Sequence, residues 1–362
     1  MAAVLAALQR KASEGNAFIS VSFILKSKMK KQEEKPLEQV WHYHSFNEEM
    51  QERFGGKVYK LSLQTGCTCP NRDGKLGTGG CIFCSAGGSG DFAAPATLPI
   101  KEQIREAKKR VDAKRSQKFA GYLAYFQSYT NTYGPTEKLA ALYREAMMED
   151  EILGLSIGTR PDCLSAEMIA KLKELNQIKP VYIELGLQTI HEDTAAIIRR
   201  GYALPVFEDA FRRLKQAGLS VVVHVIIGLP GENEKRTEQT VQYLANLTEN
   251  GKHIDGIKLQ LLHILKGTDL AKYWEAQQNN QNSTAQIPSY TEESYAELIS
   301  KLIEDLPKTI TIHRITGDAP KSKLIAPKWS ANKKHVLNTI NQTLKKNNTK
   351  QGKNTKSNIC TK

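Results

Sequence analysis

The chain has 362 residues, and 40% of them are hydrophobic, so it can form one large globular domain or two ordinary ones. No stretch approaches the roughly 18 to 20 consecutive apolar residues of a membrane-spanning helix. The apolar run 16–25 is followed by the basic run 26–31, where a signal peptide would have its cleavage site. These features predict a cytoplasmic protein, in which clustered cysteines indicate a metal or redox site rather than disulfides.

The net charge of +13 is concentrated near the C-terminus. No acidic residue follows Asp318, whereas eleven lysines do, and the region 37–318 is nearly neutral. A lysine-rich tail can bind phosphates and release their counterions, which favours a nucleic acid as partner. The alternative is a solvated tail that only keeps the protein soluble.

The two ends of the chain lack the pattern of a folded core. Residues 1–40 are predicted to be a disordered N-terminal extension, with Met29 as an alternative start. Residues 348–362 are polar and basic, and they are predicted to be a disordered tail in which Cys360 is incidental.

Between these ends, short β-branched or apolar segments alternate with amphipathic ones, which predicts repeated β–α units around a parallel sheet. The predicted strands are 57–63, 122–127, 154–158, 181–187, 220–227, 256–262 and 309–315. The predicted helices are 100–116, 136–149, 165–176, 205–217, 235–249 and 291–304. We therefore expect an α/β fold, a partial (β/α)6 TIM-like barrel over residues 41–306, with a helical C-terminal extension over 307–347. In such barrels the functional residues gather at the C-terminal ends of the strands.

Four of the six cysteines lie in one loop, residues 66–91, after the first predicted strand. Cys81 and Cys84 form a C-x-x-C pair, a spacing that lets two thiolates bind one metal centre. Cys67 and Cys69 lie upstream, across a segment rich in glycine, asparagine and proline that can fold back. Zinc would use four thiolates in a closed structural site, whereas a [4Fe-4S] cluster held by three thiolates keeps one iron open. The position at the expected mouth of a barrel favours the reactive cluster.

Further blocks of the sequence, in order along residues 45–347, resemble the radical S-adenosylmethionine (SAM) superfamily, in particular a bacterial group related to the Elongator catalytic subunit. The blocks are ERFGGKVYKLSLQTG, CPNRDGKLGTGGCIFC, AYFQSYTNTY, LSIGTRPDCL, YIELGLQTIHEDTAAIIRRGY, VIIGLPGE, IKLQLLHILKGTDLA and IHRITGDAPKSKLIAPKWSANKK. The resemblance implies a [4Fe-4S] cluster with SAM bound to its open iron. It also implies that an unidentified one-electron donor drives reductive cleavage of SAM, followed by removal of a hydrogen atom from the substrate.

By this resemblance the cluster ligands are Cys69, Cys81 and Cys84. The group usually has an aromatic residue at the position of Cys67, so Cys67 is expected to pack beside the cluster. Cys163 is expected to be an inert buried thiol.

The resemblance also implies residues that contact SAM, all at the ends of predicted strands or in the turns that follow. They are Gln127, Asn131, Thr159, Arg160, Asp162, Gln188, Gly228, Gly231 and Glu232. Arg160 can pair with the carboxylate of SAM while Asp162 orients it, although a purely structural ion pair would use the same two residues. The two glycines would let the backbone approach the adenine, or they form a plain strand-to-helix turn. Glu184 is expected to be a polar barrel residue, and His224 replaces a glycine of the family pattern.

Candidate catalytic residues with weaker support lie near the same expected mouth: Tyr129, His263, Lys266 and His313. Together with Arg314 and Asp318, they could hold an anionic substrate group or transfer a proton. A structural role fits each of them as well.

The substrate is predicted from the resemblance. Proteins of the Elongator type act on the wobble uridine of transfer RNA (tRNA), and closer look-alikes suggest conversion of carboxymethylaminomethyl uridine to aminomethyl uridine. The basic tail suits tRNA, and Trp329 could stack on a base or pack in a helix contact. Two alternatives are a radical SAM enzyme acting on a small molecule or peptide, and a zinc-stabilised nucleic-acid-binding module.

Overall fold

The computed structural model describes residues 42–88, 90–113, 115–279 and 285–355. The predicted extension 1–40 and Cys360 lie outside these residues. Within the described ranges, no helix is both long and apolar enough to cross a membrane.

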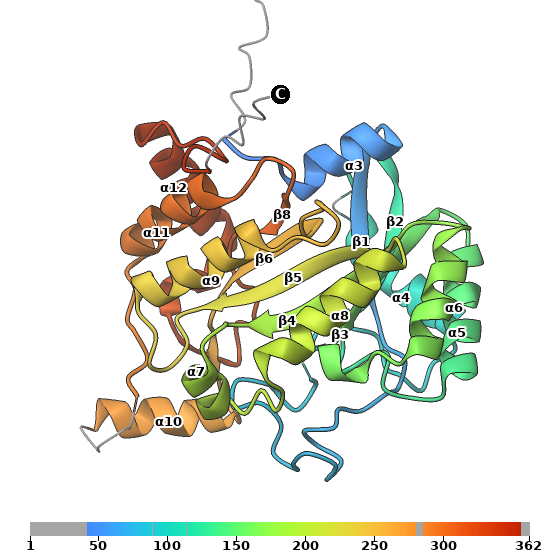
Figure 1. Cartoon of the computed structure of the whole chain (residues 1–362), viewed down its shortest axis with the longest axis horizontal. Helices are drawn as coiled ribbons and strands as arrows, with labels where there is room; N and C mark the ends of the chain where they lie inside the picture. Colours follow the sequence, from blue (N-terminus) through green and yellow to red (C-terminus); the bar gives the residue numbers. More distant parts are fainter. Residues whose placement is uncertain (1–41, 89, 114, 280–284, 356–362) are drawn as a thin grey trace, which may run out of the picture. The chain divides into compact units, whose positions relative to one another are not determined.

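Seven parallel strands form one sheet in the order β1-β2-β3-β4-β5-β6-β8 (Figure 1). The strands are β1 (Lys57–Leu63), β2 (Phe119–Phe126), β3 (Ile152–Thr159), β4 (Val181–Gln188), β5 (Ser220–Ile227), β6 (Gly256–Leu261) and β8 (Thr311–Arg314). Each strand pairs with the strands that precede and follow it in this order, as expected for repeated β–α units. The predicted partial barrel is confirmed, and each of its seven strands overlaps one of the seven strands predicted from the sequence.

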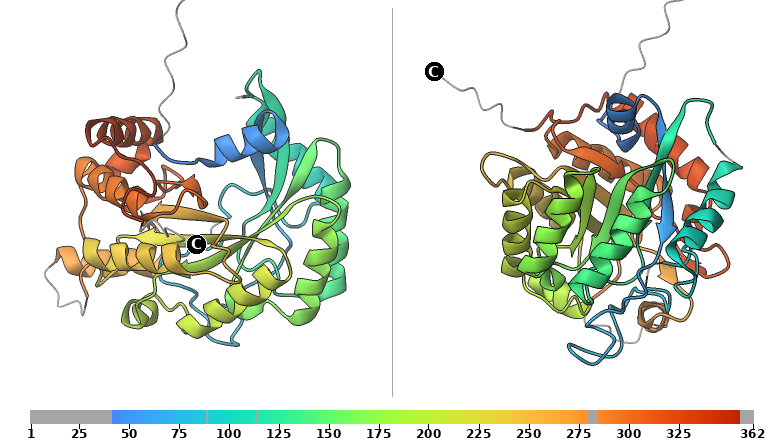
Figure 2. Two further views of the ribbon diagram at one scale, coloured as in Figure 1. Left: turned by 45° about the horizontal axis from the view of Figure 1, so that its top comes forward. Right: turned by 90° about the vertical axis from the view of Figure 1, so that its right-hand side faces the viewer.

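Helices cover the outer face of the sheet, which curls away from them (Figure 2). They are α4 (Ile100–Asp112), α5 (Thr136–Met148), α6 (Ala166–Asn176), α8 (Leu204–Gln216), α9 (Glu234–Asn246) and α11 (Glu292–Asp305). Two other helices, α7 (Glu192–Ile197) and α10 (Asp269–Gln278), lie beyond the C-terminal ends of the strands (Figure 1). In α8 the residues Phe207, Ala210, Phe211 and Leu214 are buried, at the spacing of one helical face. These faces and the outward side chains of the strands form the main hydrophobic core.

The inner face of the sheet changes from apolar to polar along the barrel. A small core lies near the N-terminal ends of the strands and consists of Met50, Val58, Leu123, Tyr182 and Val222. Its residue Met50 belongs to α3 (Phe46–Phe54), a helix absent from the sequence prediction. Helix α3 begins at a capping box between Ser45 and Glu48 and ends at Gly55, whose φ of 73° favours glycine. Further along the barrel the inward residues are polar, and the cavity described below begins there.

The C-terminal region is helical, as predicted. Helix α12 (Lys333–Lys346) buries Val336, Ile340 and Leu344 and packs on α11. Before it, β9 (Leu324–Ala326) pairs antiparallel with β7 (Ile264–Leu265). Among the described residues, the 3-10 turn η2 (Lys328–Ala331) precedes α12, and a second one, η1 (Pro161–Cys163), follows β3. The predicted boundary at 306/307 falls before β8, which belongs to the barrel sheet.

The packing of Trp329 decides between its two interpretations. Its indole N–H donates to the carbonyl of Tyr290 at 2.9 Å, and its ring lies 5.7 Å from that of Tyr295. The half-buried Trp329 therefore packs within the protein, as the second interpretation proposed.

The prediction of a disordered tail is wrong for residues 348–355. Thr349 and Gln351 are buried, and the Gln351 amide donates to the carbonyls of Pro307 and Ile310, both at 2.8 Å. Polar side chains here satisfy carbonyl groups left after α11, an interaction that hydropathy does not reveal. Residues 356–362 lie outside the described part of the chain.

Candidate functional site

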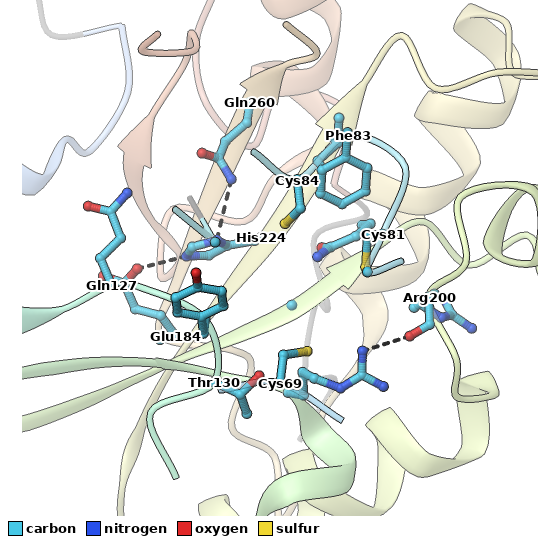
Figure 3. Close-up of a pocket in the computed structure, with 18 of the residues that line it drawn as sticks. Cys69, Cys81, Phe83, Cys84, Gln127, Thr130, Glu184, Arg200, His224 and Gln260 are labelled. Carbon is cyan, nitrogen blue, oxygen red and sulfur yellow. Dashed lines mark hydrogen bonds and ion pairs between the residues drawn. The ribbon is translucent and has the colours of Figure 1, made fainter. Parts of the chain in front are cut away.

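A cavity of about 240 Å³ lies at the C-terminal ends of the strands, where the sequence predicted the functional residues. Its lining includes Cys69, Cys81 and Cys84. In Figure 3 the sulfur atoms of these three residues face the same part of the cavity. The three predicted cluster ligands thus meet in one place.

The cysteine loop folds back on itself through Arg72. The Cys69 carbonyl accepts hydrogen bonds from the amides of Arg72 and Asp73, at 2.8 and 3.2 Å. The Arg72 guanidinium then donates to the carbonyls of Cys84 and Ser85, at 3.2 and 2.9 Å. These bonds join the Cys69 turn to the C-x-x-C turn, so the loop holds its thiols together without help from regular secondary structure.

Cys81 is half-buried, and its sulfur contacts an amide of the loop. Its sulfur accepts a hydrogen bond from the Asn71 amide at 3.5 Å, and the same amide donates to the carbonyl of Arg199 at 2.7 Å. Burial, and then the neighbouring Cys84, raise the pKa of Cys81 to about 12. Asn71 therefore connects the cluster loop to the segment after α7.

The other two described thiols lie outside the cavity lining. Cys67 is half-buried against the main core, and burial raises its pKa. The Cys163 sulfur lies 3.7 Å from a carboxylate oxygen of Asp162, and burial raises its pKa to about 12. In the described ranges, no three His, Cys, Asp or Glu side chains are arranged to hold a single metal ion.

Four of the predicted SAM contacts line the cavity, namely Gln127, Thr159, Arg160 and Gln188. Gln188 ends β4 with a φ of 69°, in the left-handed region that a non-glycine residue rarely adopts. Its buried Oε1 has no hydrogen-bond partner among the described residues, and neither has Oγ1 of the neighbouring lining residue Thr130. Unpaired buried acceptors are costly in a closed protein interior, so the cavity is suited to a ligand that donates hydrogen bonds.

Arg160 forms an ion pair with Asp162, an arrangement that fits both interpretations given from the sequence, a SAM contact and a purely structural pair. The guanidinium Nε and Nη2 donate to the two carboxylate oxygens at 2.9 and 2.8 Å, and Nη1 donates to the carbonyl of Arg200 at 2.8 Å. The guanidinium carbon also lies 4.9 Å from the centre of the Tyr202 ring. Asp162 is outside the cavity lining, so it orients Arg160 from behind.

The remaining predicted SAM contacts lie outside the cavity lining. Asn131 is fully buried, and its amide donates to the carbonyls of Phe126 and Gly158, which fixes two strand ends. Gly228 lines a second, smaller cavity instead, of about 40 Å³. Gly228 and Gly231 have φ values of 95° and 80°, so the turn needs glycine at both positions. Glu232 is buried, which raises its pKa.

Among the candidate catalytic residues, Tyr129 and His263 line the cavity, whereas Lys266 is exposed and outside the lining. Burial lowers the pKa of His263 to about 4, so its ring is neutral at physiological pH. His263 covers Gly317, where a Cβ atom would lie 2.3 Å from the ring. His263 therefore offers a neutral imidazole rather than a charged one.

His313 does not reach the predicted mouth. Its ring lies 3.6 Å from the Glu49 carboxylate and 4.9 Å from the Phe46 ring, both in α3. The reason is that β8 pairs with the first residues of β6, Gly256–Lys258, so His313 lies near the N-terminal ends of the strands. The pairing is irregular there: Ile257 pairs with Ile312, but Lys258 pairs with Arg314. Burial lowers the pKa of His313 to about 4.

Several lining residues were absent from the sequence prediction: Tyr125, Thr130, Arg200, Tyr202 and Gln260. A signal for one of them exists in β6, where Lys258 and Gln260 alternate with apolar residues in an otherwise buried strand. Because alternate residues of a strand face the same side, this pattern indicates polar side chains pointing into the barrel.

Comparison with known proteins identifies the family. Residues 67–244 match the Radical SAM superfamily, and residues 254–346 match the Radical_SAM C-terminal domain. The Bacillus subtilis protein YtqA, described as uncharacterized, is 39% identical over 311 residues, which are 86% of this chain and 92% of YtqA. The chain belongs to the radical SAM superfamily.

Radical SAM enzymes use a [4Fe-4S] cluster and SAM. The residues of this cavity fit both groups: three thiols face one space, and the unpaired acceptors of Gln188 and Thr130 lie beside it. Family membership therefore favours the iron–sulfur interpretation of the cysteine loop over the zinc interpretation.

The chain is also similar, at lower sequence identity, to Elongator complex protein 3. That protein from Schizosaccharomyces pombe is 28% identical over 173 residues, which are 48% of this chain and 29% of the relative. The solved structure of Elp3 from the archaeon Methanocaldococcus infernus superposes with a TM-score of 0.59 at 17% identity, covering 81% of this chain and 64% of Elp3. This radical SAM chain spans less than two thirds of either relative, and the superposition shows a shared fold.

Proposed function

We propose that this radical SAM enzyme modifies the wobble uridine of tRNA, converting its carboxymethylaminomethyl form to the aminomethyl form. In this proposal Cys69, Cys81 and Cys84 hold the cluster, because they are the described thiols that meet in the cavity. That convergence at the C-terminal ends of the strands is the observation that carries the catalytic part of the proposal.

The residues around the cavity have distinct proposed roles. Bound together, a reduced [4Fe-4S] cluster and SAM supply a strong acceptor for a substrate hydrogen atom. Arg160, held in place by Asp162, presents positive charge to the carboxylate of SAM. Gln188 and Thr130 offer unpaired oxygen acceptors to the hydroxyl and amino groups of SAM.

Two observations support tRNA as the substrate. The first is the relationship to Elongator complex protein 3. The second is the charge of the C-terminal region, although the ion pairs Lys333–Asp318, Lys346–Glu297 and Lys353–Glu304 use part of it internally. Four exposed lysines of this region make neither an ion pair nor a side-chain hydrogen bond with any described residue: Lys321, Lys334, Lys345 and Lys350. They remain available for phosphates.

The surroundings of Arg314 support the proposal that the side arm of the substrate carries a carboxylate. It pairs in the sheet with Lys258, whose Nζ lies inside the barrel, 3.1 Å from the Tyr125 hydroxyl of the cavity lining. Paired residues of neighbouring strands face the same side, so we place the Arg314 side chain in the interior with Lys258, next to the residues that line the cavity. No hydrogen bond or ion pair to the guanidinium is made within the described part of the chain. The carboxymethyl group of the arm would provide the missing anion.

Comparison of modified nucleosides from cells with and without the gene tests the proposal. Deletion is expected to leave carboxymethylaminomethyl uridine in place of the aminomethyl form, and complementation with the intact gene should restore the normal profile. An unchanged wobble-uridine profile would contradict the tRNA substrate. We also propose that the enzyme acts in the cytoplasm with a one-electron donor.

A further inference from the structure

A buried carboxylate, Glu184, is the centre of a polar network beneath the cavity. One of its oxygens accepts hydrogen bonds from Lys60 Nζ at 2.7 Å and Ser156 Oγ at 2.5 Å. The other oxygen accepts from Lys258 Nζ, and from His224 Nε2 at 2.7 Å. Burial alone would raise the pKa of Glu184, but Lys258 and then Lys60 hold it well below its usual range. Glu184 is therefore ionised and can only accept hydrogen bonds.

This network determines the tautomer of His224. Because Glu184 only accepts, the Nε2 atom of His224 carries the hydrogen. Burial, and then the charge of Lys258, lower the pKa of His224 to about 4, so the ring is neutral and its Nδ1 is an acceptor. The Nε2 atom of Gln260 lies 3.3 Å from this Nδ1 and donates to it (Figure 3).

The bond to His224 fixes the orientation of the Gln260 amide. Rotating the amide by half a turn would place its Oε1 against the lone pair of Nδ1, where two acceptors would repel each other. The bond uses one N–H of the amide. The second N–H and Oε1 make no hydrogen bond with any residue that the structure describes. Gln260, His224 and Glu184 all line the cavity, so the amide offers a donor and an acceptor there in a fixed order.

We propose that Gln260 binds the imide edge of the substrate base and selects uracil over cytosine. This inference rests on the proposed function, which places a pyrimidine in the cavity. Uracil has a carbonyl at O4 beside the N3–H donor, matching the N–H and Oε1 of Gln260. Cytosine carries an amino donor at N4 beside a bare N3, so a base held in the same position would set donor against donor and acceptor against acceptor.

Glu184 and His224 are positioning residues in this arrangement. They do not contact the base, but they decide which end of the amide meets O4. A well-placed two-bond contact discriminates between bases by about tenfold to a hundredfold. That discrimination depends on the fixed orientation, because an amide free to rotate would accept either order.

The test is binding of fluorescein-labelled anticodon stem-loop RNAs that differ only in uridine or cytidine at the wobble position. Fluorescence anisotropy gives the dissociation constants for the full-length protein, reconstituted with its cluster and saturated with SAM, at one salt concentration. The variants are Gln260→Leu, which removes both hydrogen-bonding groups, and His224→Phe, which frees the amide to rotate. Gln177→Leu is the matched control, because Gln177 is exposed at the end of α6. Absorbance near 400 nm and the unfolding temperature verify that each variant is folded and loaded.

The wild type and Gln177→Leu are expected to prefer uridine by about tenfold or more, and Gln260→Leu to lose this preference. His224→Phe is expected to narrow the preference while still binding the uridine loop. A preference that survives in Gln260→Leu, or a wild type that binds both loops equally well, would overturn the inference and leave the tRNA proposal standing. A wild type that binds neither loop better than an unrelated hairpin would contradict both.

Discussion

Arg160 and Asp162 form a two-bond ion pair at the edge of the cavity, with N–O distances of 2.9 and 2.8 Å. The pair joins the end of β3 to the turn after it, and only Arg160 reaches the cavity. Its geometry holds a positive charge next to the proposed SAM site.

Replacing Asp162 by Asn is expected to weaken SAM binding and to destabilise the protein. The side chains of Arg160 and Asp162 are only 10% and 20% exposed, so the variant leaves a mostly buried charge without its counterion. The expected loss is about 3 kcal/mol of unfolding free energy, measured by denaturant titration. Asp209→Asn breaks the surface pairs with Arg212 and Arg213 on α8 and should cost less than about 1 kcal/mol. Equal losses in the two variants would contradict the buried role of Asp162.

Replacing Asn71 by Leu is expected to lower the reduction potential of the cluster. Asn71 donates a hydrogen bond to the Cys81 sulfur, and such bonds favour the more negative, reduced state. A redox titration followed by electron paramagnetic resonance measures the potential. Asn246→Ala, on the exposed side of α9, should leave it unchanged. An unchanged potential in Asn71→Leu would show that the contact does not act on the cluster.

Stability is expected to fall as the pH is lowered from about 6.5 towards 4. Burial lowers the pKa of His224, His263 and His313 to about 4, whereas unfolded histidine titrates near 6.5. Between these values the unfolded chain binds more protons, so acid favours unfolding. His313→Gln should reduce the slope of unfolding free energy against pH by about 1.4 kcal/mol per pH unit within this window. Denaturation curves at several pH values measure the slope, and an unchanged slope would place His313 in a solvated site.

Replacing Arg314 by Gln is expected to weaken binding of the carboxylated substrate selectively. The dissociation constant for RNA with a carboxymethylaminomethyl uridine should rise by about tenfold, the equivalent of one charge-assisted hydrogen bond. Binding of RNA with an unmodified uridine should hardly change, because it lacks the anion. Arg314→Lys should retain part of the affinity. Equal weakening for both RNAs would show that Arg314 has a structural role.

Much of the fold could be predicted from the sequence, because most strands and helices carry their own periodic pattern. The strand β5 has the predicted bounds 220–227, and the rule on strand ends located the cavity. Helix α3 could also have been found, since Ser45 and Glu48 have the spacing of a capping box. The three cysteines could be selected because Cys67 departs from the family pattern.

The site itself was less predictable where it depends on tertiary contacts. Because the pairing of β6 and β8 skips His313, Arg314 pairs with the inward-facing Lys258. No pattern in the sequence predicts this irregular pairing. The role of Gln260, on β6, follows from the tautomer of His224, on β5. That tautomer depends in turn on the carboxylate of Glu184, on β4. Asn131 lies at a strand end but satisfies backbone carbonyls, so position alone could not decide its role.

The most direct test of the central claim is release of 5′-deoxyadenosine from SAM by anaerobically reconstituted, reduced protein in the presence of substrate tRNA. The wild type and the control Cys67→Ala are expected to release it together with aminomethyl uridine, because Cys67 lies outside the cavity lining. Cys69→Ala, Cys81→Ala and Cys84→Ala are expected to release neither. Absence of release from the wild type, or undiminished release from Cys69→Ala, would contradict the account.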